Sequence, residues 1–286
     1  MSLPALDATA AGRPGVPAPR AAQAPDRPAR ALAAAVRAWF AVALAGQALF
    51  AAYVVLAYGR AALAGQPAVW NRIVPHAWTP GATGMNALFA SHVLLTVLVL
   101  ASGALQLLPS VRRRAPALHR WNGRFYLVAA LATALGGLAM LAVRHAGEPL
   151  AQRLPLAANA GLVALFAILA WHRARARRFQ AHSEWALRAW LATLGVWFFR
   201  LGITAWIVAN RGPVGFDAET FTGPAITAFA WAQTLVPLAA FEAWRRVRRA
   251  GGPRATFALA GGLGAATLLT AGGIATAAML LWLRRM

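Results

Sequence analysis

Seven long apolar stretches, separated by short segments that contain arginine, dominate this sequence of 286 residues. Each holds roughly 20 residues or more, enough to cross the ~30 Å hydrocarbon layer of a bilayer as an α-helix. They lie at 36–58, 82–108, 124–144, 154–171, 185–209, 222–244 and 256–283. Because lipid offers no hydrogen-bond partners to an open backbone, stretches of this length must be helical. The sequence therefore predicts an all-α integral membrane bundle of seven transmembrane helices.

The composition supports a membrane protein and excludes several kinds of site. Hydrophobic residues make up 60% of the chain and charged residues only 12%, about half the charged fraction of a typical soluble domain. The formal charge of +21 does not indicate nucleic-acid binding, because the arginines separate apolar stretches and form no continuous basic surface. Cysteine is absent, which excludes disulfides, thiolate metal sites, iron–sulfur clusters and cysteine nucleophiles.

The arginines alternate between dense and sparse segments, and this alternation predicts the orientation. The amino-terminal tail and the second, fourth and sixth connections are rich in arginine, whereas the other connections and the carboxyl terminus hold one or two each. Positive charge collects on the cytoplasmic side of membrane proteins, so we expect a cytoplasmic amino terminus and an external carboxyl terminus. Residues 1–31 are rich in proline, alanine and arginine and predict a disordered cytoplasmic tail, which leaves 32–286 as the transmembrane domain.

Two histidines, His119 and His182, stand where the third and fifth apolar helices begin on the predicted cytoplasmic side. Helix amino termini favour anions there, and the cluster Arg112–Arg114 and Arg188 add positive charge to the same side. A neutral imidazole also ligates haem iron, copper or zinc, and it titrates near neutral pH. The pair is thus a candidate for ligation or proton transfer. The alternative is that both are interfacial residues, beside arginines that only fix topology by reaching lipid headgroups.

Two further candidates lie inside the apolar stretches. His92 shares one face of the second helix with Gly103 and Gln106. This polar stripe should face other helices and not lipid, and its role is either ligand binding or helix packing. Arg200 lies well inside the fifth stretch, where a charge needs a cavity or a partner. Arg200 follows His182 on the same face of this helix after five turns, about 27 Å along the axis. It would then lie at a depth similar to that of His92.

These candidates belong to a set of short motifs. The motifs are His92 with Gly103 and Gln106, then His119-Arg120-x-x-Gly123-x-x-Tyr126, then His182-x-x-Trp185-x-x-Arg188, and finally Arg200. Together they resemble a family of bacterial polytopic membrane proteins known as domain of unknown function 2306, over residues 85–245. The resemblance implies a bacterial cytoplasmic (inner) membrane and makes Arg120, Gly123, Tyr126, Trp185 and Arg188 supporting residues. It implies no established reaction.

Three functions remain open from the sequence. The first is a haem or copper site at the histidines, in respiratory redox chemistry or cofactor handling. The second is a transporter, or a binder of a lipid or small anionic ligand, that uses Arg200 and His92. The third is a membrane scaffold without a small-molecule site. Di-metal carboxylate chemistry is excluded because no acidic residue lies in the core of an apolar stretch, and no nucleophile with an activating base is evident for hydrolysis.

Overall fold

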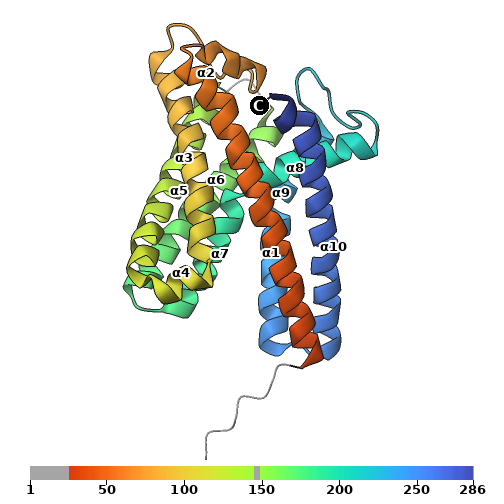
Figure 1. Ribbon diagram of the computed structural model, residues 1–286. Coiled ribbons are helices and arrows are strands. Elements are labelled where there is room, and N and C mark those ends of the chain that lie inside the picture. The colour runs from red at the N-terminus through yellow and green to blue at the C-terminus, as the bar shows by residue number, and fades with distance from the viewer. Residues whose placement is uncertain (1–25, 145–148, 286) are drawn as a thin grey trace, which may run out of the picture.

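The computed structural model describes residues 26–144 and 149–285, and the regular elements in these ranges are helices (Figure 1). The expected all-α fold is confirmed. Within the described ranges six helices are long and apolar enough to cross a membrane, and a bent pair makes a seventh span if it is counted as one. The long helices are α1 (Arg27–Val54), α3 (Thr83–Leu107), α5 (Pro116–Arg144), α6 (Leu150–Arg175), α9 (Pro224–Ala250) and α10 (Pro253–Ala277), and the bent pair is α7 (Phe179–Thr193) with α8 (Gly195–Ala209).

Shorter helical elements extend or connect the long ones. A π-helical turn and α2 (Arg60–Leu63) prolong α1, and α4 (Pro109–Arg114) turns the chain from α3 into α5. The π-helical turn after α1 is Val55–Gly59. The remaining elements are a second π-helical turn at Ala278–Trp282 and 3-10 helices at Pro67–Arg72 and Leu283–Arg285.

Helix α1 begins at Arg27, inside the segment expected to be a disordered tail. Asp26 caps it, since its side chain accepts a hydrogen bond of 3.0 Å from the Ala29 amide. Pro28 does not break the helix, because it occupies the first turn. Backbone N–H groups there have no acceptor within the helix, so the N–H that proline lacks is not missed. Residues 1–25 of the expected tail lie outside the described residues.

Successive long helices run in opposite directions, so that connections collect at two ends of the bundle. Figure 1 shows the start of α1, the α4 segment and the α9–α10 turn at one end, and α2 and the carboxyl terminus at the other. The first of these ends carries the arginine-rich connections and is called the arginine-rich end below. Which side of a membrane it faces remains a prediction.

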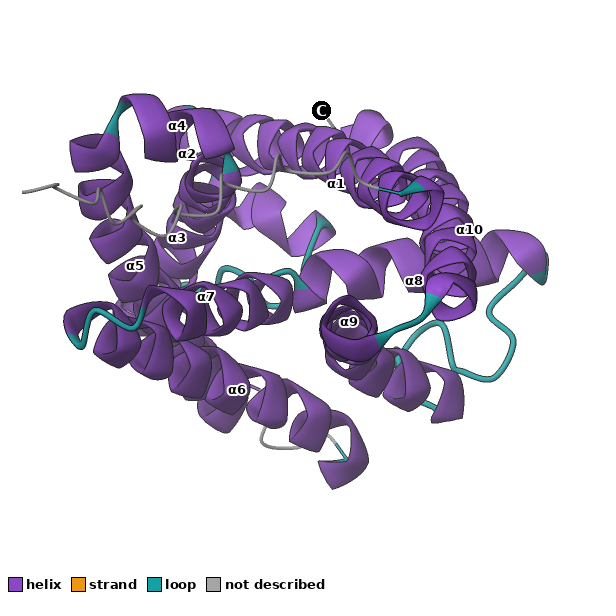
Figure 2. Cartoon of the chain, turned by 90° about the horizontal axis from the view of Figure 1, so that it is seen from below, coloured by secondary structure: helices purple, strands orange, loops and turns teal. Residues whose placement is uncertain are grey.

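Two groups of helices meet in the middle of the molecule. Helices α3, α5, α6 and α7 pack in sequence order, while α1 lies along α10, with α8 and α9 completing the second group (Figure 2). Aromatic side chains fill the contact between α1 and the end of the chain, where the Phe50 and Trp282 ring centroids are 5.4 Å apart. Trp197 and Trp282 are fully buried, so large rings form the core of this group.

The fifth apolar stretch is not one straight helix, because α7 and α8 meet at Leu194 with a bend of 46°. In a continuous helix the Ala192 carbonyl would accept a hydrogen bond from the backbone amide of Val196, four residues later. Here Asn159 of α6 donates to that carbonyl over 3.1 Å and to the Thr234 hydroxyl over 2.7 Å. Gly195 makes room for this amide, since a Cβ atom there would lie 2.9 Å from Asn159 Nδ2. A polar side chain from a neighbouring helix thus supports the break.

The bend corrects one expectation about the candidate residues. His182 lies in α7 and Arg200 in α8, on opposite sides of the break. The shared helix face and the axial distance of about 27 Å, both expected for a continuous helix, therefore do not hold.

The α8–α9 connection is ordered around Asp217. One oxygen of its carboxylate accepts from the Thr220 amide at 2.7 Å, from the Glu219 amide at 2.9 Å and from the Thr220 hydroxyl at 2.9 Å. These bonds favour the charged form, and the Thr220 amide contributes most to holding the pKa of Asp217 below its usual range.

Candidate functional site

His182 lies in the first turn of α7, and its ring is oriented by the preceding helix. Its Nδ1 atom is 2.9 Å from the Ala170 carbonyl oxygen of α6. Because a carbonyl only accepts, the neutral ring carries its proton on Nδ1 and keeps a lone pair on Nε2. A backbone carbonyl that orients one ring nitrogen in this way is typical of histidines that ligate a metal through the other.

His119 occupies the equivalent place in the first turn of α5, near His182. The two imidazoles lie close enough for their charges to interact, and Arg112 and Arg120 lie within the same range of His119. The Nδ1 atom of His119 is buried and has no hydrogen-bond partner among the described residues. We call His119 and His182 the histidine pair. Their environment is rich in positive charge and contains an unused ring nitrogen.

Helix α3 fixes the backbone of His119. Gln106 donates from Nε2 to the His119 carbonyl oxygen over 2.8 Å. Gly123, one turn further along α5, leaves room for this amide, because a Cβ atom there would be only 2.2 Å from Gln106 Nε2. Gln106 and Gly123 thus act together to position His119.

Tyr126 and Gly103 lie in the contact between α3, α5 and α7. The Tyr126 side chain is buried, and its hydroxyl is 3.1 Å from that of Thr193, the last residue of α7. A Cβ atom at Gly103 would approach both Tyr126 and Trp190 to 3.0 Å. These supporting residues therefore pack the helices around the histidine pair and the bend.

Arg188 has a different role from the one expected. We expected it to add free positive charge beside the histidines, but it is buried and paired. Its Nε donates to Glu242 of α9 over 2.9 Å, and its guanidinium lies 4.6 Å over the Trp185 ring and 5.0 Å over the Phe241 ring. The charge of Arg188 is therefore already balanced by Glu242.

Two more arginines extend this contact into the α7–α9 ion-pair cluster, which consists of Glu184, Arg188, Glu242, Arg245 and Arg249. Arg245 bridges both carboxylates, at 2.5 Å to Glu242 and 2.8 Å to Glu184. Arg249 donates to Glu184 over 2.6 Å. The two glutamates were not candidates in the sequence analysis, although Glu184 precedes Arg188 by four residues and Glu242 precedes Arg245 by three, the spacings of helical ion pairs.

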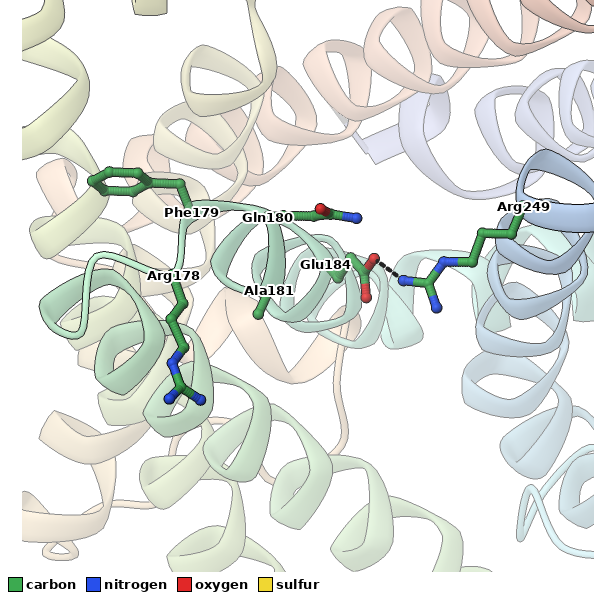
Figure 3. Close-up of a pocket in the computed structure, with 6 residues that line it drawn as sticks. All are labelled: Arg178, Phe179, Gln180, Ala181, Glu184 and Arg249. Atoms are coloured by element: carbon green, nitrogen blue, oxygen red, sulfur yellow. Dashed lines mark hydrogen bonds and ion pairs between the residues drawn. The ribbon is translucent and has the colours of Figure 1, made fainter.

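An open pocket of about 370 Å³ lies beside the cluster (Figure 3). It is lined by Arg178, Phe179, Gln180, Ala181, Glu184 and Arg249. Figure 3 shows Arg249 directed at Glu184, while Arg178 and Phe179 point away from that pair. Its two arginines do not converge on a common point, so this pocket is a weak candidate for an anion site.

His92 and Arg200 contact different helices. The His92 ring lies against α5, where Cβ atoms at Gly136 and Gly137 would be 3.7 Å and 3.5 Å from it, and it interacts with the backbone of Thr133. Arg200 lies 5.4 Å over the Phe50 ring of α1. The packing of the His92 ring and the ring contact of Arg200 thus involve different helices.

Within residues 26–144 and 149–285, no cluster of three or more His, Asp or Glu side chains is placed to hold a metal ion. A metal site in this part of the chain would therefore use two histidines with further ligands from the bound group itself. Haem provides such ligands through its porphyrin nitrogens.

Comparison with known proteins gives one match. A family model described as "Predicted membrane protein (DUF2306)" matches residues 89–242. The match includes the histidine pair, Arg200 and the acidic residues of the ion-pair cluster, and leaves α1 and α10 outside. No curated protein and no solved structure matches the chain.

Proposed function

Since the chain belongs to the DUF2306 family of predicted membrane proteins, we propose that it is a multi-pass protein of the bacterial cytoplasmic membrane that ligates haem iron or copper through His119 and His182. Its role would be respiratory redox chemistry or cofactor handling. The two ligands share one chemistry, which is coordination by neutral imidazole.

The observation that carries the proposal is the bond between His182 Nδ1 and the Ala170 carbonyl at 2.9 Å. It directs the lone pair of the neutral ring to Nε2, the form that a metal needs. His119 supports the proposal through its proximity to His182, its unpartnered Nδ1 and the backbone bond from Gln106.

The surrounding charge favours haem over a copper ion. Arg112 and Arg120 lie near His119, and Glu184, two residues after His182, is already paired with Arg245 and Arg249. Positive neighbours disfavour a bare cation, whereas they stabilise the carboxylates that haem carries as propionates. In this proposal the histidines coordinate the iron and the two arginines bind the propionates.

The test is an absorption spectrum with metal analysis of the purified protein and of His119→Ala and His182→Ala. We expect a haem spectrum that both substitutions abolish. His92→Ala is the matched control, since this ring lies in α3 against α5 and should leave the spectrum unchanged. Stoichiometric copper without haem would show that the histidine pair binds copper instead of haem. Wild-type protein that is colourless, free of metal and unable to take up either ligand would refute the proposal.

The transporter alternative has less support, because Arg200 contacts α1 and His92 contacts α5. A scaffold without a small-molecule site remains the outcome to accept if the histidine pair binds nothing.

A further inference from the structure

Five exposed arginines form a patch at the corner where α4 leads into α5. This arginine patch consists of Arg112, Arg113, Arg114, Arg120 and Arg124. In the described part of the chain none of the five belongs to an ion pair. The two glutamates at the arginine-rich end, Glu184 and Glu242, are already engaged by the ion-pair cluster. Within the described ranges these arginines therefore have no carboxylate partner and are available to an external anion.

An exposed apolar stripe continues from this patch along α5. Its members are Leu118, Trp121, Phe125 and Val128, with exposed fractions of 48%, 68%, 46% and 60%. Their spacing of three, four and three residues places them on one face of the helix. The stripe and the patch also touch each other, because the Arg124 guanidinium lies 4.7 Å over the Trp121 ring. One helix thus presents cationic groups at its end and apolar groups deeper in the expected bilayer.

From this arrangement we infer that the α4–α5 corner is a binding site for an anionic phospholipid. Arginine binds phosphate through parallel hydrogen bonds, and tryptophan favours the membrane interface. The headgroup phosphate contacts the arginine patch, and an acyl chain lies along the stripe. A soluble anion would use the arginines but not the stripe. The headgroup is bound by Arg113, Arg114 and Arg124, whereas Arg112 and Arg120 are the arginines near His119. The lipid site therefore adjoins the histidine pair without using its arginines, and this inference goes beyond the proposed function.

The experiment measures anionic lipid bound to the purified full-length chain in nanodiscs of phosphatidylglycerol and phosphatidylcholine. The test variant is R113Q/R114Q/R124Q, which leaves the two arginines near His119 unchanged. The matched control is R246Q/R248Q/R254Q, which removes the same charge from exposed positions at the same end of the bundle. We expect the test variant to lose at least about tenfold in retained phosphatidylglycerol, and the control to lose little.

Two further measurements distinguish a lipid site from a site for a soluble anion and from general attraction to the membrane surface. Trp121→Ala removes part of the stripe without changing charge, and it should also lower lipid retention. Inorganic phosphate should not displace the bound lipid. Equal losses in both triple variants would show general attraction to the membrane surface and overturn the inference. Displacement by phosphate, or full retention in the test variant and in Trp121→Ala, would overturn it as well.

Discussion

Arg188 donates to Glu242 across 54 positions of sequence, and this ion pair joins α7 to α9. The arginine side chain is only 10% exposed, and Trp185 and Phe241 flank its guanidinium. Removing one partner of such a pair leaves the other poorly solvated, which is the costly change, whereas an exposed pair contributes little.

Arg188→Ala should therefore destabilise the protein by about 1–3 kcal/mol, a range that allows for the half-exposed Glu242. Thermal unfolding in detergent measures the effect. Arg246→Ala is the control, since Arg246 is exposed and outside the cluster, and it should leave the melting temperature almost unchanged. Equal melting temperatures for the two variants would contradict the prediction.

Asn159 and Gly195 should show coupled effects at the bend. Asn159→Ala removes the side-chain donor from the Ala192 carbonyl and from the Thr234 hydroxyl and should cost about 1–3 kcal/mol. Gly195→Ala forces a Cβ atom against the Asn159 amide and should also destabilise. In the double variant the steric conflict is gone, so the summed cost of the single variants should exceed that of the double variant. Additive free energies of unfolding would show that the two residues act independently.

Gly123→Ala should disturb His119 through Gln106. The new Cβ atom would overlap Gln106 Nε2, so we expect a loss of about 1–3 kcal/mol and weaker binding of any ligand of the histidine pair. Gly161→Ala is the matched control, because the added Cβ meets no atom within 4 Å, and the change should be neutral or slightly stabilising. Thermal unfolding and the absorption spectrum together test this prediction, and a Gly123→Ala variant as stable as the control would contradict it.

Asp217 should make the stability of the connection between α8 and α9 depend on pH. The pKa of Asp217 is lower in the folded protein than that of a free aspartate, with the Thr220 amide as the main cause. Its bonds therefore stabilise the connection at pH values above about 3.9, and this contribution is lost as the pH falls below that value. An NMR titration of the Asp217 carboxyl carbon should show a midpoint below about 3.9. A midpoint at or above the ordinary value would refute the assignment.

The absence of cysteine makes the orientation testable by single labelling sites. Ser183→Cys lies at the arginine-rich end and Ala64→Cys at the opposite end, both exposed. If the arginine-rich end is cytoplasmic, an impermeant maleimide should label Ala64→Cys in intact spheroplasts and reach Ser183→Cys only after lysis. The reverse pattern would invert the predicted topology.

The helical spans were predictable because hydrophobicity and the alternation of arginines are local properties of the chain. The break at Leu194 was not, because no proline interrupts the 185–209 stretch and the break is supported by Asn159 of another helix. The similar depth of His92 and Arg200 stays a prediction. Depth does not define the direction in which a side chain points, and the packing of the His92 ring and the ring contact of Arg200 involve α5 and α1.

The candidate site was predicted in part. The sequence placed His119 and His182 at two helix starts on one end of the bundle, and the structure places them near each other. Arg188 was misjudged because its partner Glu242 lies 54 residues away, and the sequence gives no direct sign of that contact. The spacing of glutamates and arginines within α7 and α9 was the signal that could have drawn attention to the cluster.

The arginine-rich end has one more property, which follows from the absence of lysine in the chain. A guanidinium stays protonated throughout the physiological pH range, and it is not a substrate for lysine acetylation. The positive charge that these arginines carry is therefore constant, both during acidification of the cell and under enzymes that neutralise lysine.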